Sequence, residues 1–325
     1  MSSSSEWEIP PQAQPKPEDW NFDLDLALSS VLTLRATIPG DAFTAGTLGT
    51  ERAGNAVIIR EDGVVLTIGY LITEAETLWL NTVDGRAVPG HVLAYDQDSG
   101  FGLVQALGRL QLPALKLGRS SAAQPGDRVV VAGGGGRQHA IAARIAAKQE
   151  FTGYWEYYLE EAIFTAPAHP NWGGTALIGS SGELLGIGSL HLQQGRESGP
   201  PEHLNMIVPI DLLKPIYQDL LTLGRRNRPP RPWLGLYATE IDDKVVVAGL
   251  ANAGPARRAH LKTGDIILAV GGEEIDDLAT LYRKIWTRGE AGVEVPLLVY
   301  RDGKTIDFNI RSADRARFLK APSLH

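Results

Sequence analysis

The sequence predicts a mainly β protein with two domains, the second of them smaller and of the α+β type. The first observation is a series of short apolar segments between residues 31 and 164, separated by turn residues instead of long helices. Such spacing is typical of β-barrels and sandwiches. The second observation is an arginine- and proline-rich stretch, 225–232, followed by a compact set of strands with one amphipathic helix. A chain of 325 residues is long enough for each part to bury its own core.

The first domain is predicted to span residues 22–224 and to follow a disordered tail, residues 1–21. The tail is rich in Ser, Pro, Glu and Gln, and such a composition buries too little apolar surface to offset the entropy lost on ordering. The segment Phe22–Ser30 is expected to form one or two helical turns. The expected strands are β-branched or alternate apolar with polar residues, and they are Val31–Ile38, Asn55–Ile59, Val64–Ile68, Thr77–Thr82, Ala87–Ala94, Phe101–Gln105, Arg128–Ala132, Ile141–Lys148 and Tyr154–Phe164.

A helix from Asp211 to Leu223 is expected to close the first domain. Asp211 is its candidate N-cap, and Gly224 stands where a C-terminal glycine belongs. The basic stretch that follows, 225–232, is short and proline-rich, so we interpret it as a solvated linker.

The second domain is predicted over residues 233–312. It contains a helix from Asp276 to Arg288 whose apolar residues recur at i, i+3, i+4 and i+7, which is the pattern of a helix packed on one face. Residues 313–325 are expected to be a C-terminal tail.

Composition excludes several classes of partner and cofactor. A net charge of -7 and a pI near 5.6 argue against nucleic-acid binding, which needs clustered lysines and arginines. No stretch reaches the ~18 consecutive apolar residues of a membrane span. The first residues lack a basic start followed by an apolar core, so we predict a cytoplasmic protein. Without cysteine or a metal-ligand spacing, we expect neither a metal nor a cofactor.

Short motifs along both predicted domains resemble those of the HtrA/DegP family of trypsin-like proteases. Each motif alone is weak, but together they follow the family's order along the chain. The resemblance implies a chymotrypsin-like double β-barrel followed by an α+β PDZ domain, from about Val31 onward. The motifs are Asp62–Thr67, Asp84–Arg86, Leu112–Gly118, Pro125–Val130 and Gly182–Ile187 in the first domain, and Gly254–Ala256, Leu261–Ile267 and Arg301–Lys304 in the second.

The resemblance also locates the three positions of the family's Ser-His-Asp triad. The family segment N-P-G-N-S-G-G-P-L matches H-P-N-W-G-G-T-A-L here, which puts Gly173 at the serine. The segment L-T-N-N-H-V-V matches L-T-I-G-Y-L-I and puts Tyr70 at the histidine. The segment T-D-I-A-L-L matches S-G-F-G-L-V and puts Gly100 at the aspartate. All three catalytic groups are replaced, so we predict that the protein is not an enzyme.

The region of the oxyanion hole differs from the family as well. Asn171 takes the place of a flexible glycine, and the bulky Trp172 follows it. Two histidines near the matched cleft, His169 and His191, show no metal-ligand spacing, so we expect no metal site. Asp98, close to the lost aspartate, is interpreted as a surface turn residue.

The resemblance assigns peptide binding to the second domain. PDZ domains bind an extended peptide as an added strand, and backbone N–H groups of a short loop hold its terminal carboxylate. We expect a ligand that ends in a hydrophobic residue with a free carboxylate; the alternative is that the apolar residues of the site only fill the core. The predicted site consists of the loop residues Trp233, Leu234, Gly235 and Leu236 and the helix residues Leu278, Leu281 and Tyr282.

Two groups of aromatic residues lie outside these sites. The run Tyr154–Tyr158 is predicted to be part of a strand, in which Trp155 and Tyr157 face away from its two end residues. Both core packing and a contact surface fit this run. Trp20 and Phe22 precede the first strand, where family members associate, so we expect a homotrimer.

These features predict a catalytically inactive HtrA-like protein that binds a protein or peptide, through a hydrophobic C-terminus, as an adaptor, chaperone or scaffold subunit. One alternative is a serine endopeptidase whose catalytic residues have moved to other positions. The other alternative is a purely structural subunit of a larger complex.

Overall fold

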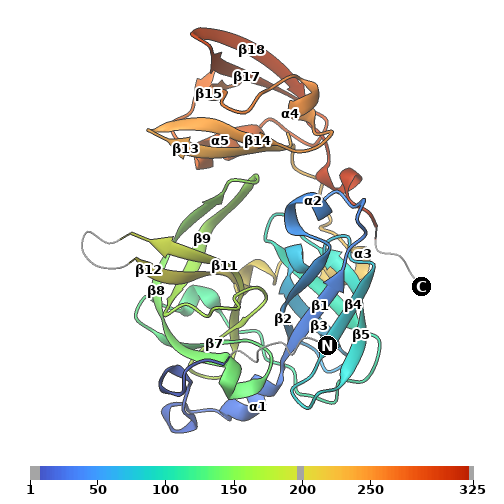
Figure 1. Ribbon diagram of the computed structural model, residues 1–325, viewed down its shortest axis with the longest axis vertical. Coiled ribbons are helices and arrows are strands. Elements are labelled where there is room, and N and C mark those ends of the chain that lie inside the picture. The colour runs from blue at the N-terminus through green and yellow to red at the C-terminus, as the bar shows by residue number, and fades with distance from the viewer. Residues whose placement is uncertain (1–7, 196–200, 322–325) are drawn as a thin grey trace. The chain divides into compact units, whose positions relative to one another are not determined.

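The computed structural model describes residues 8–195 and 201–321 (Figure 1). By their contacts, these residues fall into two compact units. The first unit contains the residues up to 149, 161–227 and residue 321, and the second contains 150–160 and 228–320. The second unit therefore differs from the predicted domain, 233–312, by a short hairpin, 150–160, and by its wider bounds of 228 and 320. None of the helices in these ranges is long and apolar enough to cross a membrane.

Six antiparallel strands close the first barrel of the first unit, in the order β1-β2-β3-β6-β5-β4. All five residues of β3 are buried, and its one hydroxyl, on Thr67, donates to the backbone oxygen of Asn55 at 2.7 Å. The interior of the closed barrel covers one face of this strand, and residues outside the barrel cover the other. The strands are β1 (Val31–Thr37), β2 (Glu51–Ile58), β3 (Val64–Ile68), β4 (Thr77–Asn81), β5 (Ala87–Tyr95) and β6 (Phe101–Ala106).

Six further strands close the second barrel, in the order β10-β11-β12-β9-β8-β7. Its interior is an apolar cluster that includes Val129, Val131, Ile163 and Ile207. A turn at Ser180–Gly182 joins two of these strands. The strands are β7 (Arg128–Ala132), β8 (Ala140–Gly153), β9 (Tyr157–Ala166), β10 (Ala176–Ile178), β11 (Leu184–Gln194) and β12 (Glu202–Pro209).

The predicted disordered tail is partly ordered. Residues 1–7 lie outside the described residues, but Ile9 is 3% exposed, belongs to the core of the second barrel and donates its N–H to the Gln138 oxygen. One apolar anchor among many polar residues is invisible to an argument from composition. The helical elements up to the second barrel are η1 (Pro11–Ala13), η2 (Pro17–Asp19), α1 (Leu24–Ser29), α2 (Ala45–Leu48), η3 (Gly69–Leu71), η4 (Ser120–Ala122) and η5 (Gly136–His139).

The helix that ends the first unit is shorter than predicted. Only α3 (Tyr217–Leu223) is α-helical, after a separate 3-10 turn, η6 (Ile210–Leu212). Pro215 accounts for the break, because proline lacks an N–H and disfavours helix before it. The predicted end is confirmed: Gly224 adopts the left-handed conformation with φ of 66°.

The second unit is a twisted sheet in the order β13-β14-β15-β17-β18, with β16 paired to β15. One helix, α5, packs its apolar face on this sheet, and its N-cap Asp277 accepts the N–H of Thr280 at 2.6 Å. The elements are β13 (Leu236–Ile241), β14 (Lys244–Leu250), α4 (Pro255–Arg258), β15 (Ile266–Val270), β16 (Glu273–Glu274), α5 (Leu278–Trp286), β17 (Glu294–Arg301), β18 (Lys304–Arg311) and η7 (Arg315–Phe318).

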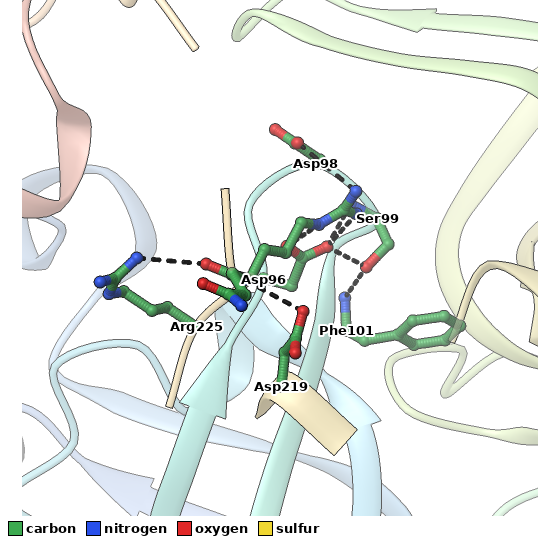
Figure 2. A network of polar contacts seen from close by, with 8 residues as sticks. Asp96, Asp98, Ser99, Phe101, Asp219 and Arg225 are labelled. Carbon is green, nitrogen blue, oxygen red and sulfur yellow. Dashed lines mark hydrogen bonds and ion pairs between the residues drawn. The ribbon is translucent and has the colours of Figure 1, made fainter. Parts of the chain in front are cut away.

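The predicted solvated linker is not solvated where it starts. Arg226 donates from Nε and Nη2 to the buried carboxylate of Asp96, at 2.5 and 2.6 Å. The Ser99 hydroxyl and N–H donate to the same carboxylate, as Figure 2 shows. These donors hold the pKa of Asp96 below its usual value against the opposing effect of burial. The linker begins as part of the first barrel, because a buried carboxylate needs a paired cation.

Candidate functional site

The structure brings the three matched triad positions together. Tyr70 lies on η3, directly after β3, and its hydroxyl donates to the Ser189 oxygen at 2.8 Å. A Cβ built on Gly173 would lie 2.7 Å from that hydroxyl oxygen. Gly100 lies beside η3, because its oxygen accepts the N–H of Gly69, the residue before Tyr70, at 2.6 Å. The phenol of Tyr70 therefore occupies the space that a side chain at position 173 would enter.

The phenol of Tyr70 is a hydrogen-bond donor at this site. Burial raises its pKa well above the usual value of a tyrosine, although the neighbouring Trp172 side chain acts in the opposite direction. The group therefore stays protonated around neutral pH, and its proton is committed to the Ser189 oxygen.

Asn55, which the sequence reasoning missed, fixes the bend that contains Gly173. Its side-chain nitrogen donates to the oxygens of Asn171 and Gly173, each at 3.0 Å, and its backbone N–H donates to Gly173 as well. Its side-chain oxygen accepts the N–H of Gly134 at 2.9 Å. The side chain is fully buried, so each of these bonds satisfies a group that water does not reach. An asparagine within an apolar strand was the only signal in the sequence.

His169 is a structural residue of the same bend. Its Nε2 lies 3.0 Å from the His139 oxygen, and its Nδ1 accepts the N–H of Asn171 at 3.2 Å, which assigns the proton to Nε2. Burial lowers its pKa to about 4, so the ring is neutral at pH 7. The N–H of Asn171, at the position of a family oxyanion donor, is thus used inside the bend. The oxygen of Trp172 is used there too, by Thr175.

His191 lies beside a pocket of the first unit. Its ring packs at a tilt against Trp172 and His203, with ring centres 5.3 and 5.0 Å apart. The facing ring nitrogens of the two histidines are 3.1 Å apart. Burial and the neighbouring His203 lower its pKa. The pocket measures 580 Å³, and Arg144 and Glu202 also line it. The described parts of the chain hold no group of three or more acidic or histidine side chains that fits a metal ion.

In the second unit, the loop before β13 surrounds a carboxylate. The Oε1 atom of Glu156 accepts the N–H groups of Leu234, Gly235 and Leu236 at 3.2, 2.7 and 3.1 Å. The Oε2 atom accepts the N–H of Leu234 at 3.1 Å. Burial raises the pKa of Glu156 to about 7, while the loop N–H groups and Arg315 act to lower it. This loop is the one that the resemblance assigned to a peptide carboxylate.

The remaining residues of the predicted peptide site lie in the core of the second unit. The four side chains of Leu278, Leu281, Tyr282 and Leu234 are at most 5% exposed. Trp233 packs against Phe318, with ring centres 4.9 Å apart. The four side chains pack in one apolar cluster, and their part in peptide binding stays a prediction.

The predicted strand Tyr154–Phe164 starts three residues too early, because β9 begins at Tyr157. Residues 154–156 form the turn between β8 and β9, and Glu156 has a left-handed φ of 57°. Trp155 and Tyr157 stack at 5.5 Å, and Tyr154 packs edge-on against Trp155. The aromatic residues have high strand propensity, but contacts with the loop Leu234–Leu236 and with α5 in the same unit specify a hairpin turn here.

Profiles of two known families match the chain. One, described as a trypsin-like peptidase domain, matches residues 54–187, and one described as a PDZ domain matches residues 232–311. A Pseudomonas fluorescens protein named "Probable periplasmic serine endoprotease DegP-like" is 28% identical over 267 residues, or 78% of this chain and 54% of the relative. A Haemophilus influenzae protein named "Probable periplasmic serine protease do/HhoA-like" is 29% identical over 274 residues, or 79% and 57%.

Solved structures share the fold. The HtrA-type protease AlgW with tripeptide has a TM-score of 0.52 at 23% identity, over 92% of this chain and 97% of that chain. The serine endoprotease from Yersinia pestis has a TM-score of 0.51 at 22% identity, over 90% and 98%. This chain is an HtrA-like protein. The predicted chymotrypsin-like double β-barrel followed by a PDZ domain is confirmed. The chain spans little more than half the length of the Pseudomonas and Haemophilus relatives.

Two predictions from the sequence are corrected by these relatives. The prediction that the protein is not an enzyme is contradicted, because the relatives of this HtrA-like protein are named as serine proteases and endoproteases. The predicted cytoplasmic location is contradicted, because the Pseudomonas and Haemophilus relatives are named as periplasmic. Both predictions were drawn from something missing in the sequence, and a missing motif excludes neither an activity nor a compartment.

We predict that Gly173→Ala lowers the free energy of unfolding by about 1–3 kcal/mol, the range for overpacking a buried site. The added Cβ would lie 2.7 Å from the Tyr70 hydroxyl oxygen, which is itself held by a hydrogen bond. In a Tyr70→Phe background the same change should cost clearly less, because that oxygen is gone. Urea unfolding of the wild type, both single variants and the double variant measures this coupling.

Gly46→Ala is the control for this cycle. Gly46 lies in the short helix α2, and a Cβ there meets no atom within 4 Å. Its substitution should leave stability within about 0.5 kcal/mol of the wild type. An equal cost of Gly173→Ala with and without the phenol oxygen would show that Tyr70 does not fill the space beside position 173.

Proposed function

We propose that this HtrA-like protein binds extended polypeptide segments with its PDZ domain, in the role of an adaptor, chaperone or scaffold subunit. The observation that carries the proposal is the loop Leu234–Leu236, whose three N–H groups converge on one carboxylate. Charge-assisted hydrogen bonds of this kind are roughly twice as strong as neutral ones. The loop is therefore built to hold a carboxylate, and a free peptide C-terminus supplies the same group.

The strand next to the loop supports binding of an extended peptide. β13 is at the edge of the sheet, so no further strand of that sheet pairs with its outer side, where the N–H of Ala238 donates to the Tyr154 oxygen. The helix α5 packs in one apolar cluster with β13, and the N–H of its first residue, Leu278, donates to the Glu240 carboxylate of that strand at 2.8 Å. The solved HtrA-type protease AlgW carries a tripeptide in one structure and a decapeptide in another.

The residues behind the loop favour a hydrophobic last side chain in the ligand. Leu234, Leu236, Leu278 and Leu281 are apolar and belong to one cluster with Tyr282. A charged terminal side chain among them would lose its hydration without gaining a partner. The preferred ligand is therefore a protein or peptide with a hydrophobic C-terminus.

Two further properties belong to this proposal. A periplasmic location is supported by the names of the relatives from Pseudomonas and Haemophilus.

A homotrimer stays a prediction. In the chain, Phe22 packs against Gly182, and the Arg128 guanidinium lies 5.4 Å from the Trp20 ring centre. Light scattering should give the mass of three chains; a monomer that Trp20→Ala and Phe22→Ala leave unchanged would rule the trimer out.

A second candidate function is hydrolysis of peptide bonds by groups outside positions 70, 100 and 173. The names of the relatives favour it, and the pocket beside His191 and His203 offers a place for such groups. If this candidate is right, casein is cleaved, cleavage survives Gly173→Ala, and His191→Ala or His203→Ala abolishes it. Intact casein at high protein concentration from pH 5 to 9, or cleavage that both histidine variants retain, excludes this pocket as the active site.

Peptide binding is tested on the full chain with labelled peptides that end in Val, Leu or Phe. Because Glu156 holds the loop in the structure, Glu156→Ala is measured beside the wild type. We expect the Glu156→Ala chain to bind free-acid peptides roughly tenfold to a hundredfold more tightly than amidated ones, the range for charge-assisted hydrogen bonds. Fluorescence anisotropy measures the dissociation constants.

The matched control compares two glycines of the second unit. Gly235 and Gly272 both have left-handed φ, of 72° and 84°, so alanine strains the backbone at either position. A Cβ on Gly235 also meets the Trp233 ring at 3.0 Å, whereas one on Gly272 meets nothing within 4 Å. Gly235→Ala should abolish the preference for the free acid, and Gly272→Ala should keep it. Equal affinity for acid and amide in every chain would refute a carboxylate site.

A further inference from the structure

The hairpin Glu150–Glu160 is a part of the second unit, although its stems continue into strands of the second barrel. Its turn, residues 154–156, carries one acidic residue, Glu156, which is 6% exposed. An ionised carboxylate leaves water at a large cost unless charges or hydrogen bonds replace the lost hydration. The contacts of this turn therefore show which groups replace the lost hydration of Glu156.

The side chain of Glu156 contacts the loop Leu234–Leu236. Three consecutive N–H groups, of Leu234, Gly235 and Leu236, donate to its Oε1 atom, the shortest of these bonds being 2.7 Å. The positive charge of Arg315 acts on the same carboxyl. The Nε and Nη1 atoms of Arg315 are buried and have no hydrogen-bond partner among the residues that the structure describes. The loop and this cation together make a site for an anion.

The backbone of the turn meets the edge strand and the helix of the PDZ domain. The Tyr154 oxygen accepts the N–H of Ala238, in β13, at 3.0 Å. The Glu156 N–H donates to the Tyr282 hydroxyl, in α5, at 3.1 Å. Beside these bonds, the Tyr154 ring packs against Tyr237 with centres 6.0 Å apart. The turn thus contacts both elements that a bound peptide would contact.

The stem of the hairpin adds contacts to α5. Tyr158 packs edge-on against Trp286, with ring centres 6.4 Å apart. The Arg283 guanidinium lies over the Tyr158 ring at 5.4 Å and 3.7 Å from the Glu150 carboxylate. These groups are partly exposed, so they add specificity more than affinity. Glu156 also holds a left-handed φ of 57°, a conformation that persists where surrounding contacts impose it.

We propose that the hairpin Glu150–Glu160 is the resident ligand of the PDZ domain, with the Glu156 side chain in the place of a peptide's terminal carboxylate. This inference rests on the proposed peptide-binding function. The loop Leu234–Leu236 offers one set of N–H groups, so the hairpin and a C-terminal carboxylate exclude each other. A partner enters the groove by displacing Glu156, and the affinity measured for it is reduced by the fraction of chains in which the hairpin is bound.

The first experiment measures the hairpin without any peptide. Hydrogen exchange of the Leu234, Gly235 and Leu236 amides is followed in the full wild-type chain, in Glu156→Ala and in the closer isostere Glu156→Gln. We expect exchange of these amides to be about tenfold or more faster in Glu156→Ala, because their acceptor is gone. Glu160→Ala is the control: it removes an exposed acidic residue from the same hairpin and should exchange like the wild type.

The second experiment measures competition. A labelled peptide that ends in Val with a free carboxylate is titrated into the same four chains. We expect Glu156→Ala to bind about 10 to 100 times more tightly than the wild type, the effect of removing a competing bound state. Glu160→Ala should bind like the wild type, and Glu156→Gln should lie between the wild type and Glu156→Ala.

The two readouts separate this inference from the proposed function. Fast exchange of the loop amides in the wild type, equal to that in Glu156→Ala, overturns the hairpin as resident ligand. Slow exchange that Glu156→Ala releases, with no peptide bound by any chain, supports the resident hairpin and refutes the peptide-binding function. Equal peptide affinity of the wild type and Glu156→Ala shows that the groove is open, and it also overturns the inference.

Discussion

The second unit depends on one buried carboxylate and the three backbone N–H groups that hold it. Burial of Glu156 removes its hydration, and the loop Leu234–Leu236 replaces that hydration with donors at 2.7 to 3.2 Å. The loop benefits equally, because N–H groups that face no acceptor each cost about 1–3 kcal/mol when buried. A loop shaped for a peptide carboxylate is therefore satisfied within the chain itself. The edge of β13 and the face of α5 are engaged by the same turn.

The first unit shows how the same rule shapes the matched catalytic region. Asn55 makes three hydrogen bonds to the oxygens of the bend around Gly173 and a fourth to the Gly134 N–H. His169 uses both ring nitrogens in hydrogen bonds at the same bend. The Tyr70 hydroxyl is bound to the Ser189 oxygen and fills the space beside Gly173. The bend is thus rigidly held by side chains other than those of the family's triad. The bend includes Trp172, which packs against His191, so it also helps to position that side chain of the neighbouring pocket.

Much of the fold could be predicted because local patterns and tertiary packing agree there. The strand predicted at Val64–Ile68 has those bounds in the structure, and Gly224 ends its helix as expected. Prediction failed where a distant contact decided the outcome. Arg226 lies in a stretch that is linker-like by composition, yet it pairs with Asp96, 130 residues away along the chain. No local pattern announces such a partner.

The sequence indicated where a carboxylate binds in the second unit, but not which carboxylate. The resemblance pointed to the loop Trp233–Leu236, and N–H groups of this loop bind the Glu156 carboxylate in the structure. The sequence predicts a strand from Tyr154 because aromatic residues favour strands, and nothing in it indicates a role for Glu156. Its role follows from the tertiary contacts of a hairpin tip. Asn55 was overlooked for a similar reason, since a single asparagine in a strand has no pattern.

The pKa of Glu156 carries a direct signature of its position. Burial raises it from 4.5 to about 7, so the folded chain binds the proton more tightly than the unfolded chain does. Stability from this group is fully present below pH 4.5 and is lost as the pH rises through 7. Protonation at Oε2 competes with the bond from the Leu234 N–H to that atom, but Oε1 still accepts all three loop N–H groups. The positive charge of Arg315 also acts on this carboxyl and lowers its pKa.

The most direct measurement is a carbon-13 NMR titration of the Glu156 carboxyl in the full chain, assigned by its disappearance in Glu156→Gln. The account predicts a midpoint near pH 7, and it predicts that the Gly235 amide resonance shifts with the same midpoint. A carboxyl that titrates near pH 4.5, with a Gly235 amide that does not respond, would show that Glu156 is in water and that the loop is empty.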